Sequence, residues 1–178
     1  TAPLHPAATQ LLVSAALLVR LAQRFSRVAG YKPIAAGCEA DGTNDDVELL
    51  RQFSQPPISA AQCCPYLLPS ACAPHLAAQE QMLELQVQTI VQGAQALAAQ
   101  TDALVVEGAG GLLVPLSVHP PIDTAEVFAH IHQTLDLPVV LVVGMRLGCI
   151  NHALLTAAVL AQRGLPLAGW VANNLEAD

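Results

Sequence analysis

The sequence predicts a single α/β domain over residues 1–178, with a doubly wound, mostly parallel sheet that carries helices on both faces. Two observations lead to this prediction. Aliphatic stretches of strand length alternate with longer stretches in which apolar residues recur every three or four positions, as in β–α–β units. The stretches at 102–108 and 137–144 are almost continuously aliphatic, which is typical of parallel strands buried on both faces.

Helical patterns lie at 7–27, 43–53, 80–100, 123–135 and 150–164, and strand patterns at 28–34, 102–108, 137–144 and 167–174. Several boundaries have their own signal. Pro6 suits the first turn of the first helix, Pro33 ends the first strand, and Thr43 or Asn44 caps the second helix. Residues 54–75 contain several prolines and show no steady period, so a loop is expected there.

Charge and cysteine content limit the classes of function. The formal net charge is -7 without a basic cluster, which argues against binding to nucleic acid or to an anionic membrane. The apolar run at 11–19 is too short to span a bilayer, and no secretion signal is recognised. The five cysteines are an odd number, irregularly placed and without a C-x-x-C pair, which fits a reducing compartment. A soluble, cytoplasmic protein is therefore expected.

Charged and small residues lie at or just after the carboxyl ends of the predicted strands. In parallel α/β sheets, ligands bind beyond the carboxyl ends of the strands, so such residues are expected at one edge. They are Lys32, Glu107, the glycine-rich segment 108–111, Arg146 and Asn173. Function is expected at this edge.

Lys32 and Glu107 are the main candidates. Lys32 is the only lysine of the chain, and we expect it at a solvent-facing strand tip, as a functional cation or as an ordinary surface lysine. Glu107 and the glycines after it offer a carboxylate to Mg²⁺ and open backbone N–H groups to an anion, or form a simple turn. Asp46 is either a second magnesium ligand or an acidic residue of a first helical turn.

Two further sequence features are weaker candidates for a functional site. The helix start after Gly148 and Cys149 suits a carboxylate, or is an ordinary helix start. A zinc site built from Cys63, Cys64, Cys72 and His75 is disfavoured, because their spacing matches no standard ligand pattern.

Several segments together resemble the dethiobiotin synthetase family, in order from about residue 12 to the end. They are AGYKPIAAG (29–37), TNDDVEL (43–49), PYLLPSACAPHLAA (65–78), VVEGAGGLLVPL (105–116), LPVVLVVGMRLGCINHALLTA (137–157) and LAGWVANN (167–174). The resemblance implies a P-loop NTPase-like fold and a homodimer. It implies that ATP, Mg²⁺ and CO₂ are used to convert diaminopelargonate into dethiobiotin, through a carbamate that is phosphorylated before the ureido ring closes.

By position, the resemblance assigns a role to each matching residue. Lys32 is the catalytic cation, and Asp46 and Glu107 are the magnesium ligands. The substrate residues are Ala36, Gly108, Ala109, Gly110, Gly111, Gly148, Cys149, Ile150 and Asn151, of which the last four reach the substrate across the dimer interface. The nucleotide residues are Glu107, Gly110 and Asn173, and Asn173 reads the adenine.

Three departures from the family pattern bear on activity. A phosphate loop of the form G-x-x-x-x-G-K-[ST] is expected at about 3–11, where the chain reads PLHPAATQL and offers neither glycine nor lysine. Ala36 stands where a serine is frequent, and Arg146 replaces a frequent lysine. Two functions stay open: an active dethiobiotin synthetase, or a non-catalytic paralogue or fragment that keeps the dimer and substrate pocket but has lost ATP binding. We also expect the chain to be incomplete at both ends.

Overall fold

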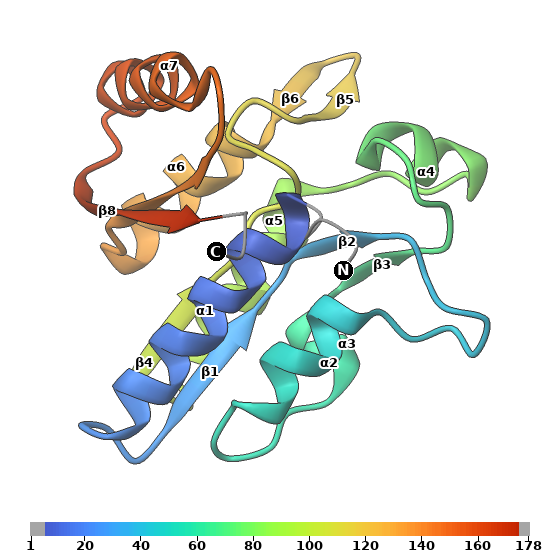
Figure 1. The fold of residues 1–178 in the computed structure, drawn as a ribbon. Coiled ribbons are helices and arrows are strands. Elements are labelled where there is room, and N and C mark those ends of the chain that lie inside the picture. The colour runs from blue at the N-terminus through green and yellow to red at the C-terminus, as the bar shows by residue number, and fades with distance from the viewer. Residues whose placement is uncertain (1–5, 175–178) are drawn as a thin grey trace.

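A computed structural model describes residues 6–174 of the chain. Its helices are α1 (Pro6–Ala22), α2 (Asp45–Gln52), α3 (Ala60–Cys63), α4 (Pro74–Glu80), α5 (Val87–Ala98), α6 (Thr124–Leu135) and α7 (Cys149–Gln162). Its strands are β1 (Val28–Tyr31), β2 (Ile34–Ala36), β3 (Tyr66–Leu68), β4 (Ala103–Val106), β5 (Pro115–Val118), β6 (Pro121–Asp123), β7 (Val139–Met145) and β8 (Leu167–Asn174). The predicted alternation of strands and helices is confirmed (Figure 1).

Parallel pairing predominates, as the aliphatic strands predicted. The pairs β1–β4, β2–β3 and β7–β8 are parallel, and the hairpin β5–β6 is antiparallel. Among residues 6–174 these are four two-stranded sheets. The single doubly wound sheet therefore stays a prediction.

Helices cover both faces of the β1–β4 pair. Side chains of a strand alternate between its faces, and β1 divides its residues accordingly. Ala29 and Tyr31 belong to a buried cluster that includes residues of α5 and α6. Val28 belongs to a second cluster with residues of α1 and α2, and a Cβ on Gly30 would approach Leu50 of α2 to 2.9 Å. This close packing on two faces fixes the position of the β1 tip.

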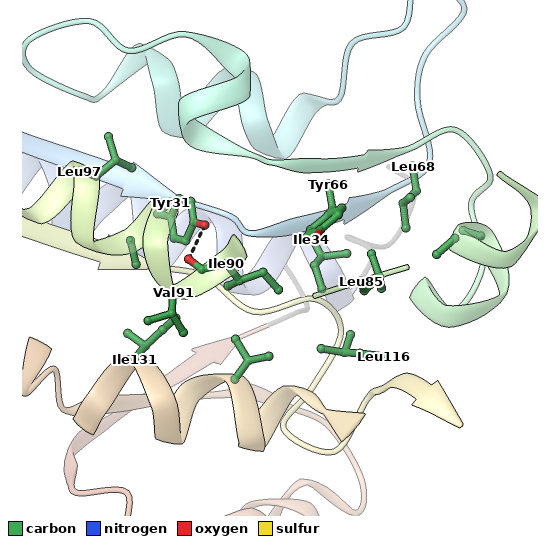
Figure 2. Close-up of a cluster of buried hydrophobic side chains, with 14 of the residues drawn as sticks. Tyr31, Ile34, Tyr66, Leu68, Leu85, Ile90, Val91, Leu97, Leu116 and Ile131 are labelled. Carbon is green, nitrogen blue, oxygen red and sulfur yellow. Dashed lines mark hydrogen bonds between the residues drawn. The ribbon is translucent and has the colours of Figure 1, made fainter. Parts of the chain in front are cut away.

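Tyr31 anchors the larger cluster. Its ring is fully buried and its hydroxyl donates a hydrogen bond of 2.8 Å to the carbonyl of Ile90, as Figure 2 shows. Burial raises the pKa of this hydroxyl above its usual range, so the tyrosine stays neutral at physiological pH. The hydrogen bond satisfies a polar group inside an apolar cluster and orients the last residue of β1.

Two boundary predictions were wrong. The expected loop at 54–75 contains α3 and β3. Ser59 and Gln62 form reciprocal capping hydrogen bonds at the start of α3. The short strand β3 is stabilised by its parallel pairing with β2. The expected helix at 80–100 begins only at Val87 with α5, because a turn that follows the end of α4 at Glu80 precedes it, and Met82 in that turn has a φ of 52°. None of the described helices is long and apolar enough to cross a membrane.

Candidate active site

Lys32 and Glu107 are neighbours because of the register of β1 and β4. Tyr31 pairs with Val106 at the carboxyl ends of the two strands, and the Glu107 N–H donates to the Tyr31 carbonyl at 2.8 Å. Lys32 follows Tyr31 and Glu107 follows Val106, so the two side chains start next to each other at the same edge of the sheet. The Lys32 N–H is fixed by the carbonyl of Cys63 at 2.9 Å.

The Lys32 ammonium contacts two carboxylates. Its Nζ lies 2.7 Å from Glu107 Oε1 and 2.8 Å from Asp46 Oδ2. The side chains of Lys32 and Glu107 are 7% and 3% exposed, and that of Asp46 is 23% exposed. The expected solvent-facing lysine was therefore wrong: the carboxylates allow the ammonium to be buried. We refer to these three side chains as the charge cluster.

The electrostatics of the charge cluster favour the charged lysine. Burial alone lowers the pKa of Lys32, but the opposing charges of Glu107 and Asp46 and their hydrogen bonds outweigh it, so the pKa is raised. A single ammonium does not balance two carboxylates. The cluster therefore retains an excess of negative charge that attracts a further cation.

Local structure at the start of α2 brings Asp46 to the cluster. Asn44 caps the helix by accepting a hydrogen bond from the Val47 N–H at 3.2 Å, one of the two caps that the sequence suggested. Its Nδ2 donates to the carbonyl of Gly37 at 2.7 Å. Asn44 thus ties the first turn of α2 to the chain after β2, and Asp46 reaches Lys32 from that turn.

The charge cluster has the donor set of a magnesium site with few protein ligands. Glu107 Oε2 is buried and has no hydrogen-bond partner within the described part of the chain, so it can accept a cation. Among residues 6–174 no group of three or more His, Cys, Asp or Glu side chains could hold a metal ion. Mg²⁺ is commonly held by only one or two carboxylates, with water and substrate phosphates as the other ligands. Glu107 and Asp46 fit that requirement.

The glycine-rich segment 108–111 leads from Glu107 into a cavity of about 650 Å³. Gly110 has a φ of +77°, a conformation that favours glycine. Gly108 approaches Phe128 of α6 so closely that a Cβ would lie 2.7 Å from the ring. Gly108, Gly110 and Gly111 line the cavity, whereas Ala109 packs against the larger buried cluster.

The start of α7 also borders this cavity. Cys149 contributes to the wall, whereas Gly148, Ile150 and Asn151 are exposed, Ile150 to 73%. Gly148 caps α7 in a left-handed conformation. The structure thus brings Glu107, the glycines and Cys149 to one cavity.

Ala36 and Asn173 lie outside the wall of the cavity. Ala36 ends β2 opposite Leu68, and Asn173 pairs with Gly144 in β8. The Asn173 Nδ2 is buried without a hydrogen-bond partner among the described residues, so it has a donor left for a ligand.

Sequence reasoning missed His152 and Ser14, which also line the cavity. The spacing of polar residues along both helices could have indicated them. Cys149, His152 and Thr156 repeat at the spacing of one helical face, and so do Ser14 and its neighbours on α1. Of the expected phosphate-loop segment 3–11, residues 3–5 lie outside the described residues, and residues 6–11 form the first turns of α1.

The comparisons with known proteins agree with this architecture. A family model described as an AAA domain matches residues 12–178, which places the chain among α/β proteins of the P-loop NTPase class. Within that class, the chain belongs to the dethiobiotin synthetase family.

Three relatives, each an ATP-dependent dethiobiotin synthetase, carry this assignment. The protein of Ralstonia nicotianae is 47% identical over 169 residues, which cover 93% of this chain and 71% of the relative. The protein of Nitrosospira multiformis is 45% identical, with 93% and 70% covered. That of Cellvibrio japonicus is 44% identical, with 96% and 74% covered.

Proposed function

We propose that this chain is an ATP- and Mg²⁺-dependent dethiobiotin synthase that forms the ureido ring of dethiobiotin from diaminopelargonate and CO₂. The observation that carries the proposal is the charge cluster: a buried ammonium between two carboxylates, next to a glycine-rich segment and a cavity. The relatives' activity and the order of the matching segments support it.

The reaction requires positioned positive charge more than a covalent group from the protein. One substrate amine adds to CO₂ and loses a proton, which gives a carbamate. A carbamate oxygen takes the terminal phosphoryl group of ATP, and ADP leaves. The second amine then attacks the carbamoyl carbon, phosphate departs with the C–O bond electrons, and a proton is lost as the ring closes.

Lys32 is suited to stabilise the anionic groups of this sequence. Its ammonium is held by Glu107 and Asp46, so it is already charged and oriented. Bound Mg²⁺ would supply positive charge next to the phosphates, with Glu107 and Asp46 as its protein ligands. Since those carboxylates would then have a second cation partner, the Lys32 ammonium could turn toward carbamate and phosphate.

The glycine-rich segment and Asn173 are proposed to contact the other ligands. Gly108, Gly110 and Gly111 leave room at the cavity wall for substrate and phosphate, and Asn173 offers its unpartnered Nδ2 to the adenine. Because the segment 3–11 supplies no glycine or lysine, we propose that ATP binds weakly, with a dissociation constant raised by about two powers of ten or more for the lost phosphate contacts.

A homodimer is proposed from the surface of α7. Leu154 and Leu155 are 66% and 59% exposed, and Leu147 before the helix is fully exposed. Several exposed large apolar side chains on and next to one helix favour an interaction site there. A second subunit would cover it and bring Gly148, Cys149, Ile150 and Asn151 to the partner's substrate.

We also propose that the fold contains a single doubly wound sheet. In each of the pairs β1–β4 and β7–β8 the two strands are parallel, and helices contact both faces of the first pair. We propose that the two pairs belong to one sheet, with the charge cluster at its carboxyl edge.

Calorimetric titration tests the proposed metal site. Mg²⁺ is titrated into the chain in the presence of ATP, and Glu107→Gln is compared with Glu84→Gln, an exposed glutamate outside the site. We expect Glu107→Gln to weaken magnesium binding about tenfold or more, equivalent to about 1.4 kcal/mol or more. Equal magnesium affinity in the two variants would contradict the assignment of Glu107 as a magnesium ligand.

A further inference from the structure

The helix α6 holds the glycine-rich segment at two points. At one end of the segment, Gly108 lies against the Phe128 ring, where an added Cβ would come within 2.7 Å of it. At the other end, the hydroxyl of Thr124 contacts the carbonyls of Gly111 and Leu112. Thr124 and Phe128 are four residues apart, so they lie on the same face of α6. One face of this helix therefore fixes both ends of the segment.

Thr124 is buried and its polar groups all bind the segment. The residue is 4% exposed. Its Oγ1 lies 2.7 Å from the Gly111 carbonyl and 2.5 Å from the Leu112 carbonyl, and its single proton is shared between these two acceptors. Oγ1 accepts from the Val114 N–H at 3.2 Å, and the Thr124 N–H donates to the Val114 carbonyl at 3.1 Å. These bonds close the loop 111–114 on the start of α6.

A second threonine of the same helix shows the ordinary arrangement. The Thr134 hydroxyl is exposed and donates to the carbonyl of His130, four residues before it, at 2.7 Å. Such a bond stays within the helix and orients nothing outside it. Thr124 instead bonds carbonyls 13 and 12 residues before it. Its hydroxyl therefore determines the path of chain outside α6.

The bonds to Thr124 set the orientation of two peptide groups. In a trans peptide the N–H of the next residue points opposite to the carbonyl, and the bonds after Gly111 and Leu112 are trans. Because both carbonyls are directed to Thr124, the N–H groups of Leu112 and Leu113 point away from it. Neither N–H has a hydrogen-bond partner among residues 6–174. Leu112 lines the same cavity as Glu107, so these donors are available to an anion at the site.

We propose that Thr124 is a positioning residue of the ring-closing reaction, whose hydroxyl keeps the N–H groups of Leu112 and Leu113 directed at the anionic oxygens of the phosphorylated carbamate. The inference rests on the function proposed above. A phosphorylated carbamate that is held in place is attacked by the second amine. One that is not held is open to water, which adds to the carbamoyl carbon while phosphate leaves with the C–O bond electrons. The carbamic acid then loses CO₂ and returns the amine, so ATP is consumed without ring closure.

Three substitutions separate the hydroxyl of Thr124 from its shape. Thr124→Val keeps the branched shape and replaces the hydroxyl with a methyl group, whereas Thr124→Ser keeps the hydroxyl. Thr134→Val makes the first exchange at the exposed threonine of the same helix and is the matched control. Circular dichroism identifies a temperature at which the parent and the three variants are fully folded, and all comparisons are made there.

Amide hydrogen exchange tests the contact without ligands or turnover. The Val114 amide is expected to exchange at least about tenfold faster in Thr124→Val, equivalent to about 1.4 kcal/mol, because its acceptor is gone. In Thr124→Ser and Thr134→Val its rate is expected to stay within about threefold of the parent rate. Equal rates in all four proteins would overturn the inference, whatever the activity of the chain.

The ratio of ADP to dethiobiotin tests the role of Thr124 in the reaction. The parent, Thr124→Ser and Thr134→Val are expected to form the two products in equal amounts, and Thr124→Val to form at least about twice as much ADP as dethiobiotin. A smaller fraction of folded protein lowers both products equally, so a purely structural role would not change this ratio.

Three results would overturn the proposal: equal amounts of the two products from Thr124→Val, neither product from it, or a Thr124→Ser protein with the same excess of ADP. Failure of the proposed function gives a different result, namely a parent chain that forms no dethiobiotin.

Discussion

At Lys32 one buried ammonium contacts two carboxylates, and this determines how the residue responds to substitution. The ammonium is 2.7 and 2.8 Å from Glu107 and Asp46, and the Glu107 side chain is only 3% exposed. Removal of the cation would leave Glu107 buried beside another carboxylate. Breaking a buried ion pair in this way is more costly than losing an exposed one.

We therefore expect Lys32→Met to lower the free energy of unfolding by about 3–5 kcal/mol in the absence of divalent cations. Mg²⁺ should restore part of the loss, because it provides a new partner for the carboxylates. Urea denaturation with and without Mg²⁺ measures both effects.

The control for Lys32→Met is Arg27→Met. Arg27 forms an ion pair of 2.6 Å with Asp102, but its side chain is 53% exposed, so a change below about 1 kcal/mol is expected. A similar decrease in the free energy of unfolding in both variants would contradict the assignment of the charge cluster as a cation site. So would a Lys32→Met protein whose free energy of unfolding does not change with Mg²⁺.

At the scale of elements, the contact between the glycine-rich segment and α6 fixes the path of the chain after Glu107. Gly108 lies against the Phe128 ring, and a Cβ would come within 2.7 Å of it. Gly169 of β8 has nothing within 4 Å of an added Cβ and serves as a matched control.

Gly108→Ala is expected to destabilise the protein by about 1–3 kcal/mol through overpacking. Combined with Phe128→Leu, the loss should be smaller than the sum of the single changes, because the ring that clashes is gone. Urea denaturation of the four proteins of this cycle gives the coupling energy. Additive losses, or an equal loss in Gly169→Ala, would show that the close approach has no energetic role.

The sequence predicted most elements of the fold and the main part of the site, for identifiable physical reasons. Continuous aliphatic runs predicted β4 and β7, and a cap at Thr43 or Asn44 predicted the start of α2, where Asn44 is the cap. The short β3 was missed because its partner β2 stabilises it, and such nonlocal pairing leaves no local period. The burial of Lys32 was missed for the same reason, since Asp46 and Glu107 are distant in sequence.

At the scale of the whole molecule, α7 is largely uncovered. Leu160 is its only buried residue among those described, whereas Ile150, Leu154 and Leu155 are exposed. A helix with this much exposed apolar surface is expected to be covered in solution.

We expect the chain to sediment as a dimer at micromolar concentration, and Leu154→Asp with Leu155→Asp to give a monomer. Charges in an apolar interface are unfavourable unless they are paired. Met82→Asp, which introduces a charge at a residue 96% exposed in the turn between α4 and α5, should leave the dimer intact. A monomeric parent chain that binds diaminopelargonate would contradict the shared pocket.

Stability should also fall at alkaline pH. Burial raises the pKa of the Cys63 thiol from 9.0 to about 11 and, together with Cys63, that of Cys64 to about 12. Unfolding exposes both thiols, so above about pH 9 the unfolded chain ionises first and gains stability. The free energy of unfolding should be constant from about pH 7 to 8.5 and decrease from about pH 9 to 12.

Urea midpoints across this range test the alkaline prediction. A Cys63→Ala, Cys64→Ala double variant should show a shallower decrease, because two of the groups that titrate are absent. A parent chain whose midpoint is the same at about pH 7.5 and about pH 10.5 would contradict the burial of these thiols.

Direct detection of product tests the proposed function itself. The chain is incubated with diaminopelargonate, bicarbonate, Mg²⁺ and millimolar ATP, and dethiobiotin and ADP are quantified by mass spectrometry. We expect the two products in equal amounts, at a rate that saturates only at high ATP concentration and falls sharply in Glu107→Gln. A folded parent chain that binds ATP and Mg²⁺ yet forms no dethiobiotin would contradict the account.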